Sequence, residues 1–220
     1  MRKMYLSAPL PFVGQKRMLA KEFMKVLEQY PDGTLFVDLF GGSGLLSHIT
    51  KSLKPHSTVI YNDFDNYRFR MKHIPQTNQL LADIREMVGN SVPRHKIIKG
   101  ELRERIFSRI EQEENSTGYV DFITLSSSIL FSMKYKLSVQ DMRKEALYNN
   151  IRKTGYPECT DYLEGLEIVS CDYKEVFNRY KDIPGVVFLV DPPYLSTDVG
   201  TYNMYWNMAD YLDVLNVLKG

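Results

Sequence analysis

The chain has 220 residues, a formal net charge of +1 and 44% apolar residues. This length and apolar content suit a globular domain with an insertion. A nearly neutral chain is not basic throughout, so any contact with nucleic acid must rely on local patches. Its two cysteines form neither a metal-ligand spacing nor a disulfide framework, and no apolar run reaches the length of a signal peptide or membrane span. We therefore expect a cytoplasmic protein without membrane contact.

The first predicted strand covers residues 34–40, and a glycine-rich turn follows it at once. Gly41, Gly42 and Gly44 separate this strand from a segment with helical spacing that begins at Leu45. Glycines at such a turn let the backbone approach a ligand closely, and the next helix presents free N–H groups at its start. Taken alone, this pattern is weak evidence because many α/β proteins have it.

A second strand is predicted over residues 58–61, and Asp63 follows it about twenty residues after the glycines. An acid at this place usually binds the hydroxyl groups of a ribose. The alternative is a structural role, in which Asp63 caps the start of the next helix.

The region between residues 67 and 164 is too long for an ordinary connection between a helix and a strand. Helical patterns at 96–114, 119–135 and 139–153 predict a mostly helical inserted domain. We expect residues 1–66 and 165–220 to form the other domain. The insertion holds two clusters of basic residues with interleaved tyrosines, which are consistent with binding to phosphates. The candidates for nucleic-acid contact are Arg94, Lys96, Lys134, Lys136, Arg143, Arg152 and Lys153. A solvated helix face explains the first cluster about equally well.

The third predicted strand begins at Ile168 and ends in Asp172, and the fourth covers residues 186–190. Asp172 either accepts a hydrogen bond from a ligand or caps the next helix. The fourth strand leads into Asp191-Pro192-Pro193-Tyr194. Because ligands of open α/β sheets bind beyond the carboxyl ends of the strands, this tetrad lies where chemistry is expected.

The tetrad suits a planar ring that carries an amino group. Proline fixes φ and has no N–H, so the carbonyls of Asp191 and Pro192 are left as rigid acceptors beside a carboxylate. Two acceptors match the two hydrogens of an exocyclic amine, and Tyr194 offers a flat surface for stacking. Adenine N6 and cytosine N4 fit this description. The structural alternative is a strand followed by a proline turn with a capping acid.

Together, Phe40-x-Gly42-x-Gly44 and the tetrad resemble the Dam-type (class alpha) DNA adenine N6-methyltransferases. The segment Pro11 to Lys16 is similar to the aromatic-x-Gly-x-Lys segment of that family, and the strand ending at Asp172 has the family's position. The resemblance implies a Rossmann-like sheet that binds S-adenosylmethionine without a metal, and an inserted helical target-recognition domain. The family normally continues into further strands, so we expect the C-terminal strands of the fold to be missing here.

The resemblance also implies roles for individual residues. Those implied at the base are Asp191, Pro192, Pro193 and Tyr194. Those implied at S-adenosylmethionine are Phe12, Gly14, Lys16, Asp38, Phe40, Gly42, Gly44, Asp63, Asp172 and Asp191. Lys16 is expected to pair with the methionine carboxylate, and its alternative is an exposed lysine in the first turn of a helix predicted over 15–29.

The activity implied is transfer of a methyl group to a flipped-out adenine in double-stranded DNA by a bacterial or phage-encoded enzyme. Alternatives are a methyltransferase for cytosine N4 or for RNA adenine, and a catalytically incomplete DNA-binding relative. With four parallel strands, the sheet would have an exposed apolar edge. A second copy of the chain or a C-terminal segment is expected to cover it.

Overall fold

The computed structural model describes residues 3–131, 135–193 and 208–219. The chain divides into two compact units, which we call the sheet unit (Met1–Phe69 with Cys159–Gly220) and the helical unit (Arg70–Glu158). Among the described residues, no helix combines the length and the apolar character needed to cross a membrane.

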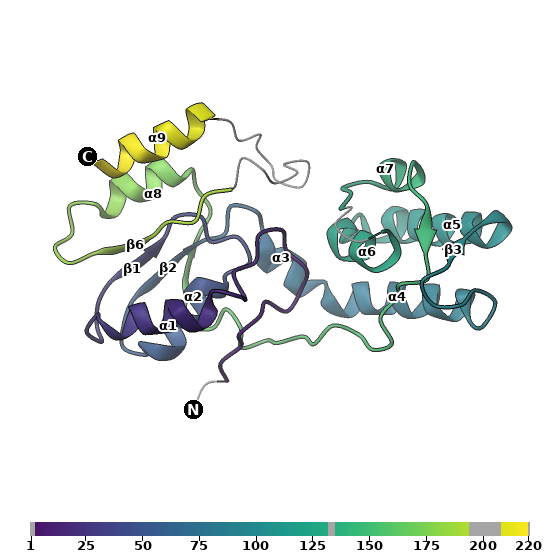
Figure 1. Cartoon of the computed structure of the whole chain (residues 1–220), viewed down its shortest axis with the longest axis horizontal. Coiled ribbons are helices and arrows are strands. Elements are labelled where there is room, and N and C mark those ends of the chain that lie inside the picture. The colour runs from purple at the N-terminus through teal and green to yellow at the C-terminus, as the bar shows by residue number, and fades with distance from the viewer. Residues whose placement is uncertain (1–2, 132–134, 194–207, 220) are drawn as a thin grey trace. The chain divides into compact units, whose positions relative to one another are not determined.

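The sheet unit is built on four parallel strands (Figure 1). They are β1 (Phe36–Asp38), β2 (Val59–Asn62), β5 (Glu167–Val169) and β6 (Val187–Leu189), in the order β5-β2-β1-β6. Phe36 lies opposite Val59 on one side and Val187 on the other. The predicted α/β architecture with a parallel sheet is therefore confirmed, although β1 and β6 are shorter than their predicted spans.

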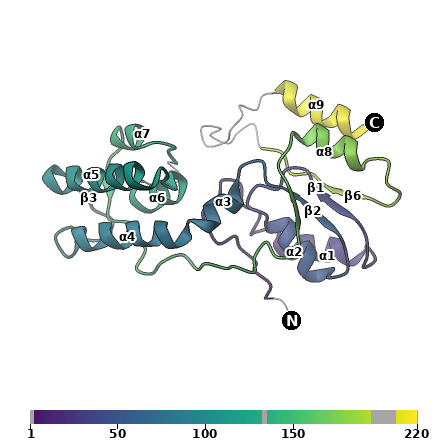
Figure 2. The same cartoon turned by 180° about the vertical axis from the view of Figure 1, so that it is seen from behind.

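Helices cover both faces of this sheet (Figures 1 and 2). Helices α1 (Ala20–Glu28) and α2 (Leu45–Leu53) pack on one face, and α8 (Tyr173–Tyr180) and α9 (Met208–Lys219) lie side by side on the other. Successive strand residues point to opposite faces. Phe36 therefore joins the α1/α2 core cluster and Val37 joins the α8/α9 cluster. Both faces are buried, which explains why the strands read as continuous apolar runs.

The edges of the sheet are β5 and β6. Glu167 of β5 is exposed, and Val187 and Phe188 of β6 are half-buried. A covering partner for the edge stays a prediction.

Helix α3 (Tyr67–Lys72) begins where it does because Asp63 caps it. The boundary between the two units falls within this helix. Helix α1 begins at Ala20, five residues later than the predicted start at Gln15. Residues 12–16 instead lie along a cavity described below.

The helical unit contains helices α4 (Ile74–Val88), α5 (Gly100–Thr117), α6 (Phe122–Ile129) and α7 (Val139–Arg143), with an antiparallel pair β3 (Ile97–Ile98) and β4 (Leu147–Tyr148). The helix predicted over 139–153 is wrong beyond Arg143. Leu147 pairs with Ile98 instead, and both side chains are buried. The other two predicted helices are shorter than expected, because residues 97–98 belong to β3 and α6 ends at Ile129.

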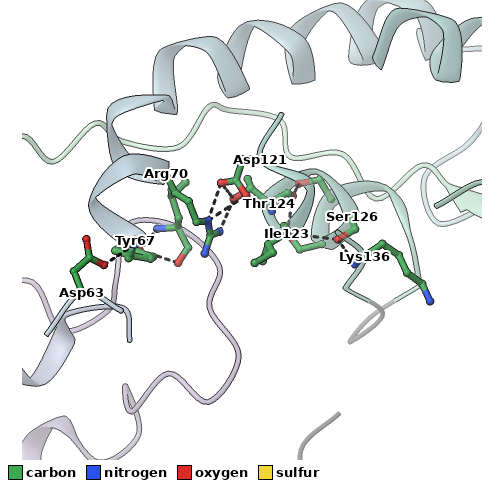
Figure 3. A network of polar contacts seen from close by, with 11 residues as sticks. Asp63, Tyr67, Arg70, Asp121, Ile123, Thr124, Ser126 and Lys136 are labelled. Atoms are coloured by element: carbon green, nitrogen blue, oxygen red, sulfur yellow. Dashed lines mark hydrogen bonds and ion pairs between the residues drawn. The ribbon is translucent and has the colours of Figure 1, made fainter. Parts of the chain in front are cut away.

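A buried ion pair organises the helical unit (Figure 3). The Arg70 Nε lies 3.2 Å from both carboxylate oxygens of Asp121, and the Arg70 Nη2 donates to the Thr124 hydroxyl at 3.1 Å. Asp121 also caps α6, because its carboxylate accepts from the backbone N–H of Thr124. One turn later, the Ser126 hydroxyl accepts from the backbone N–H of Lys136 at 3.2 Å. One carboxylate therefore fixes both the start of α6 and the arginine of α3.

Replacing Arg70 by Met should destabilise the helical unit by about 3–5 kcal/mol, because it leaves the Asp121 charge buried without its partner. Urea unfolding, with amide hydrogen exchange followed in α6, measures this loss. Arg105→Met is the control. Arg105 is an exposed residue of α5, so this substitution should change the free energy of unfolding by less than about 0.5 kcal/mol. Equal effects of the two substitutions would contradict the role given to the pair.

Candidate active site

A cavity lies at the carboxyl ends of the strands in the sheet unit. The chain runs from β1 outward through β2 to β5 and returns to the other side of β1 at β6. The strand order therefore reverses between β1 and β6, which is where open α/β sheets bind ligands. The lining comes from residues 12–16, 38–43, 45–46, 172–173 and 191–193, with Asn62, Phe64 and Asp65.

The glycine turn after β1 is held between two aromatic rings. A Cβ on Gly41 would lie 2.3 Å from the ring of Tyr61, and one on Gly42 would lie 2.9 Å from the ring of Phe12. Gly42 also has φ +49°, and Gly44, with φ +71°, stands at the N-cap of α2. A side chain at Gly41 or Gly42 would collide with these rings, so only glycine fits at these two positions. Sequence analysis placed Gly41 in the turn but gave a cofactor role only to Gly42 and Gly44, because the neighbour of Gly41, Tyr61, comes from another strand.

Asp38, at the end of β1, is completely buried and lines the cavity. The Ser47 hydroxyl donates to its Oδ2 at 2.6 Å, while Oδ1 has no hydrogen-bond partner among the described residues. Burial raises the pKa of Asp38 to about 7; the Ser47 hydrogen bond opposes this shift and the nearby charge of Asp191 adds to it. A buried carboxylate with a spare acceptor fits a cationic donor on a ligand.

Asp191 lies in the same cavity, paired with Lys16. The Lys16 Nζ is 2.8 Å from the Asp191 Oδ2 and also donates to the Gly14 carbonyl at 2.9 Å. Burial raises the pKa of Asp191, and Lys16 partly offsets this by stabilising the ionised form. The structure thus places Lys16 on the tetrad's carboxylate, where sequence analysis expected it to meet a ligand carboxylate. Pro192 and Pro193 line the cavity, and Tyr194 lies outside the described residues.

The two acids after β2 have different roles. Asp63 accepts hydrogen bonds from the backbone N–H groups of Tyr67 (2.6 Å) and Arg68 (3.0 Å), so it caps α3. It does not line the cavity, whereas Asp65 does. Of the two roles that the sequence left open for Asp63, the structure shows the cap. Sequence analysis missed Asp65, although a second acid two positions after Asp63 was visible.

Asp172 caps a helix, and its hydrogen bond to a ligand stays a prediction. Its Oδ1 accepts from the backbone N–H of Lys174 at 2.8 Å and caps α8, and the residue also lines the cavity. The neighbouring Tyr173, which sequence analysis missed, lines the cavity with its ring tilted against Phe40 at 4.9 Å between centroids.

Two of the predicted nucleic-acid contacts, Arg143 and Lys136, are paired with acidic residues. Arg143 forms ion pairs with Glu104 (2.7 Å) and Glu111 (3.0 Å), and Lys136 pairs with Glu145 at 3.1 Å. Lys134 lies outside the described residues. The partners of Arg143 are 32 and 39 residues away in the sequence, so linear charge counting could not remove Arg143 from the prediction.

The other four form what we call the basic edge of the helical unit: Arg94, Lys96, Arg152 and Lys153. All four are exposed. The backbone N–H of Asn149 donates to the Lys96 carbonyl at 2.9 Å, and Arg94 donates to the Ile151 carbonyl at 2.9 Å. These bonds place two segments that are about fifty residues apart in the sequence next to each other.

The chain is similar to known proteins over nearly its full length. Residues 12–214 match the family described as D12 class N6 adenine-specific DNA methyltransferase. The chain is also 38% identical over 224 aligned residues to a Haemophilus influenzae protein named "Putative methyltransferase", with 99% of this chain and 75% of that protein covered.

The pKa of Asp38 predicts a stability that falls as the pH rises. The folded carboxyl has a pKa of about 7 and the unfolded one about 3.9, so between these values the folded state holds the extra proton. The free energy of unfolding should therefore decrease from pH 4 to pH 7, relative to Asp38→Asn, by at most about 1.4 kcal/mol per pH unit. Urea titrations at several pH values measure it. Asp182→Asn, at an exposed position, should keep the wild-type slope; an unchanged slope in Asp38→Asn would contradict the prediction.

Proposed function

We infer the activity from the family to which the chain belongs, the D12 class N6 adenine-specific DNA methyltransferases. We propose that the chain transfers a methyl group from S-adenosylmethionine to the N6 amine of a flipped-out adenine in double-stranded DNA. The observation that carries this proposal is that one cavity contains both the glycine turn after β1 and the Asp191-Pro192-Pro193 segment after β6. A methyl donor and an amine acceptor would meet there.

The residues of the cavity fit S-adenosylmethionine, which supplies a methyl group activated by a cationic sulfur. The spare Oδ1 of Asp38 suits the ammonium of its methionine part. Asp65 takes the ribose role first expected of Asp63, since Asp65 is the acid that lines the cavity. The ring of Phe12, packed on Gly42, presents a face to which a cation is attracted. Asp172 and Tyr173 are placed to hold the adenine part, by an accepted hydrogen bond and by stacking.

Asp191 and Pro192 would act on the amine of the target base. The nitrogen lone pair of adenine N6 is delocalised into the ring, so acceptors for both amine hydrogens favour a pyramidal nitrogen and stabilise the charge that develops on it. The carboxylate of Asp191 and the carbonyl of Pro192 are these acceptors. Lys16, which is 2.8 Å from Asp191, keeps the carboxylate ionised and oriented.

We propose that the helical unit recognises the target DNA. Extruding a base from a duplex costs a few kcal/mol, which contacts to the surrounding DNA must offset. The basic edge offers four exposed cations for phosphates. This assignment retains four of the seven basic residues that the sequence suggested and removes Arg143 and Lys136, whose charges are matched by acids.

Replacing Asp191 by Asn should lower turnover by at least about 10²–10³-fold, because an acceptor for the developing charge is lost. DNA affinity should remain nearly unchanged. Methyl transfer to unmethylated duplex DNA is measured by digestion to nucleosides and mass spectrometry. Asp182→Asn, at an exposed position that does not line the cavity, serves as the control with wild-type turnover.

The modified nucleoside decides between the candidate substrates. N6-methyladenine that disappears in Asp191→Asn supports the proposal. N4-methylcytosine would move the assignment to cytosine, whose exocyclic amine the same two acceptors could bind. S-adenosylhomocysteine binding without any methylated DNA nucleoside would argue for an RNA substrate or for a catalytically incomplete relative.

The double substitution Lys96→Ala/Lys153→Ala should weaken DNA binding and lower the salt slope of the affinity by about two, one for each lost phosphate contact. Arg143→Ala is the matched control and should leave the slope unchanged, because Glu104 and Glu111 already pair with it. Fluorescence anisotropy over a range of salt concentrations measures both. If Arg143→Ala lowers the salt slope more than the double substitution does, the DNA contacts Arg143 and not the basic edge.

A further inference from the structure

A hydroxyl group of helix α9 contacts the proline turn of the cavity. The Tyr211 hydroxyl donates to the carbonyl oxygen of Pro193 at 2.6 Å. Pro193 lines the cavity, two positions after Asp191. Neither the glycine turn nor the tetrad includes Tyr211, so no motif discussed above accounts for this bond.

The position of Tyr211 is fixed by the packing of its helix. Three residues further along α9, Val214 is buried in the core cluster that also contains Val37 and Leu39. Asp213 accepts a hydrogen bond from the Tyr173 hydroxyl at 2.9 Å and forms an ion pair with Lys174. Both contacts join α9 to the start of α8 (Figure 1). The hydroxyl of Tyr211 is therefore presented by a helix that is anchored on the sheet and on α8.

The turn that Tyr211 contacts contains two consecutive prolines. Proline rings fix φ at Pro192 and Pro193, but they remove the N–H groups with which a neighbouring strand could hold the segment. The ψ angles remain soft. A hydrogen bond to the Pro193 carbonyl restricts the ψ angle of Pro193. The φ angle of Pro193 is already fixed by its ring. The orientation of the preceding peptide unit, which contains the Pro192 carbonyl, is therefore restricted as well.

We propose that Tyr211 is a positioning residue for methyl transfer. Its hydroxyl holds the Pro193 carbonyl so that the Pro192 carbonyl and the Asp191 carboxylate remain directed at the amine of the target base. This inference rests on the proposed function and adds a residue of α9 to it. Tyr211 acts only through Pro193 and touches neither reactant. A misplacement on the order of 1 Å costs up to about 100-fold in rate, so one hydrogen bond can matter for turnover more than for folding.

The test is Tyr211→Phe, which removes the hydroxyl and keeps the ring. We expect kcat for DNA methylation to fall about tenfold or more. The dissociation constant for S-adenosylhomocysteine, measured by calorimetry, and the melting temperature should stay at the wild-type values. Tyr180→Phe on α8 is the matched control. Its ring packs on the same core cluster, and its hydroxyl has no hydrogen-bond partner among the described residues. All three quantities should be unchanged in this variant.

Each other outcome is decisive. An active wild type whose Tyr211→Phe variant has an unchanged kcat would overturn the positioning role and leave the proposed function intact. A parallel loss of kcat, S-adenosylhomocysteine affinity and melting temperature would also overturn it, because the hydroxyl would then only support the fold. A wild type that methylates no nucleobase would overturn the proposed function, and the positioning role with it.

Discussion

The site depends on keeping two carboxylates at the ends of adjacent parallel strands. The register of β1 and β6 places Asp38 opposite Leu189, so Asp38 and Asp191 come to the same edge of the sheet. Burial opposes the ionisation of both, and the charge of Asp191 further raises the pKa of Asp38. Each carboxylate has a partner that stabilises its ionised form. The Ser47 hydroxyl donates to Asp38, and the Lys16 ammonium pairs with Asp191. Lys16 comes from the N-terminal segment, so the ion pair joins that segment to the turn after β6.

Side chains as well as strand pairing hold the ends of the short strands in place. The Asn62 carboxamide donates to the carbonyls of Leu39 and Cys171, and its oxygen accepts from the backbone N–H of Cys171, all within 3.1 Å. This one residue joins the carboxyl ends of β1, β2 and β5. Tyr61 adds a second connection, because its hydroxyl lies 2.8 Å from the carbonyl of Gly42. The edge that bears the site is therefore held by polar contacts, while apolar clusters hold the faces.

The sequence was informative wherever a feature is local. The apolar runs before Gly41 and Asp191 predicted β1, β6 and the α/β fold, because buried parallel strands and their end residues are adjacent in the chain. Features that depend on distant partners were not predictable. The segment after Arg143 has a helical pattern, yet Leu147 pairs with Ile98 of β3. The contribution of Tyr211 depends on the packing of α9 against the sheet, which no spacing in the sequence reveals.

The division of the chain has a consequence for its synthesis. The helical unit is continuous, whereas the sheet unit is made from the two ends of the chain. The helical unit emerges from the ribosome before β5 and β6 do, so it is free to fold first. Strand β1 must wait for its neighbour β6, which follows roughly 150 residues later, or about 10–30 s at ordinary elongation rates. During this interval one edge of β1 has no partner. The nascent chain is then exposed to intermolecular strand pairing, and chaperones that bind short apolar segments would have their best target there.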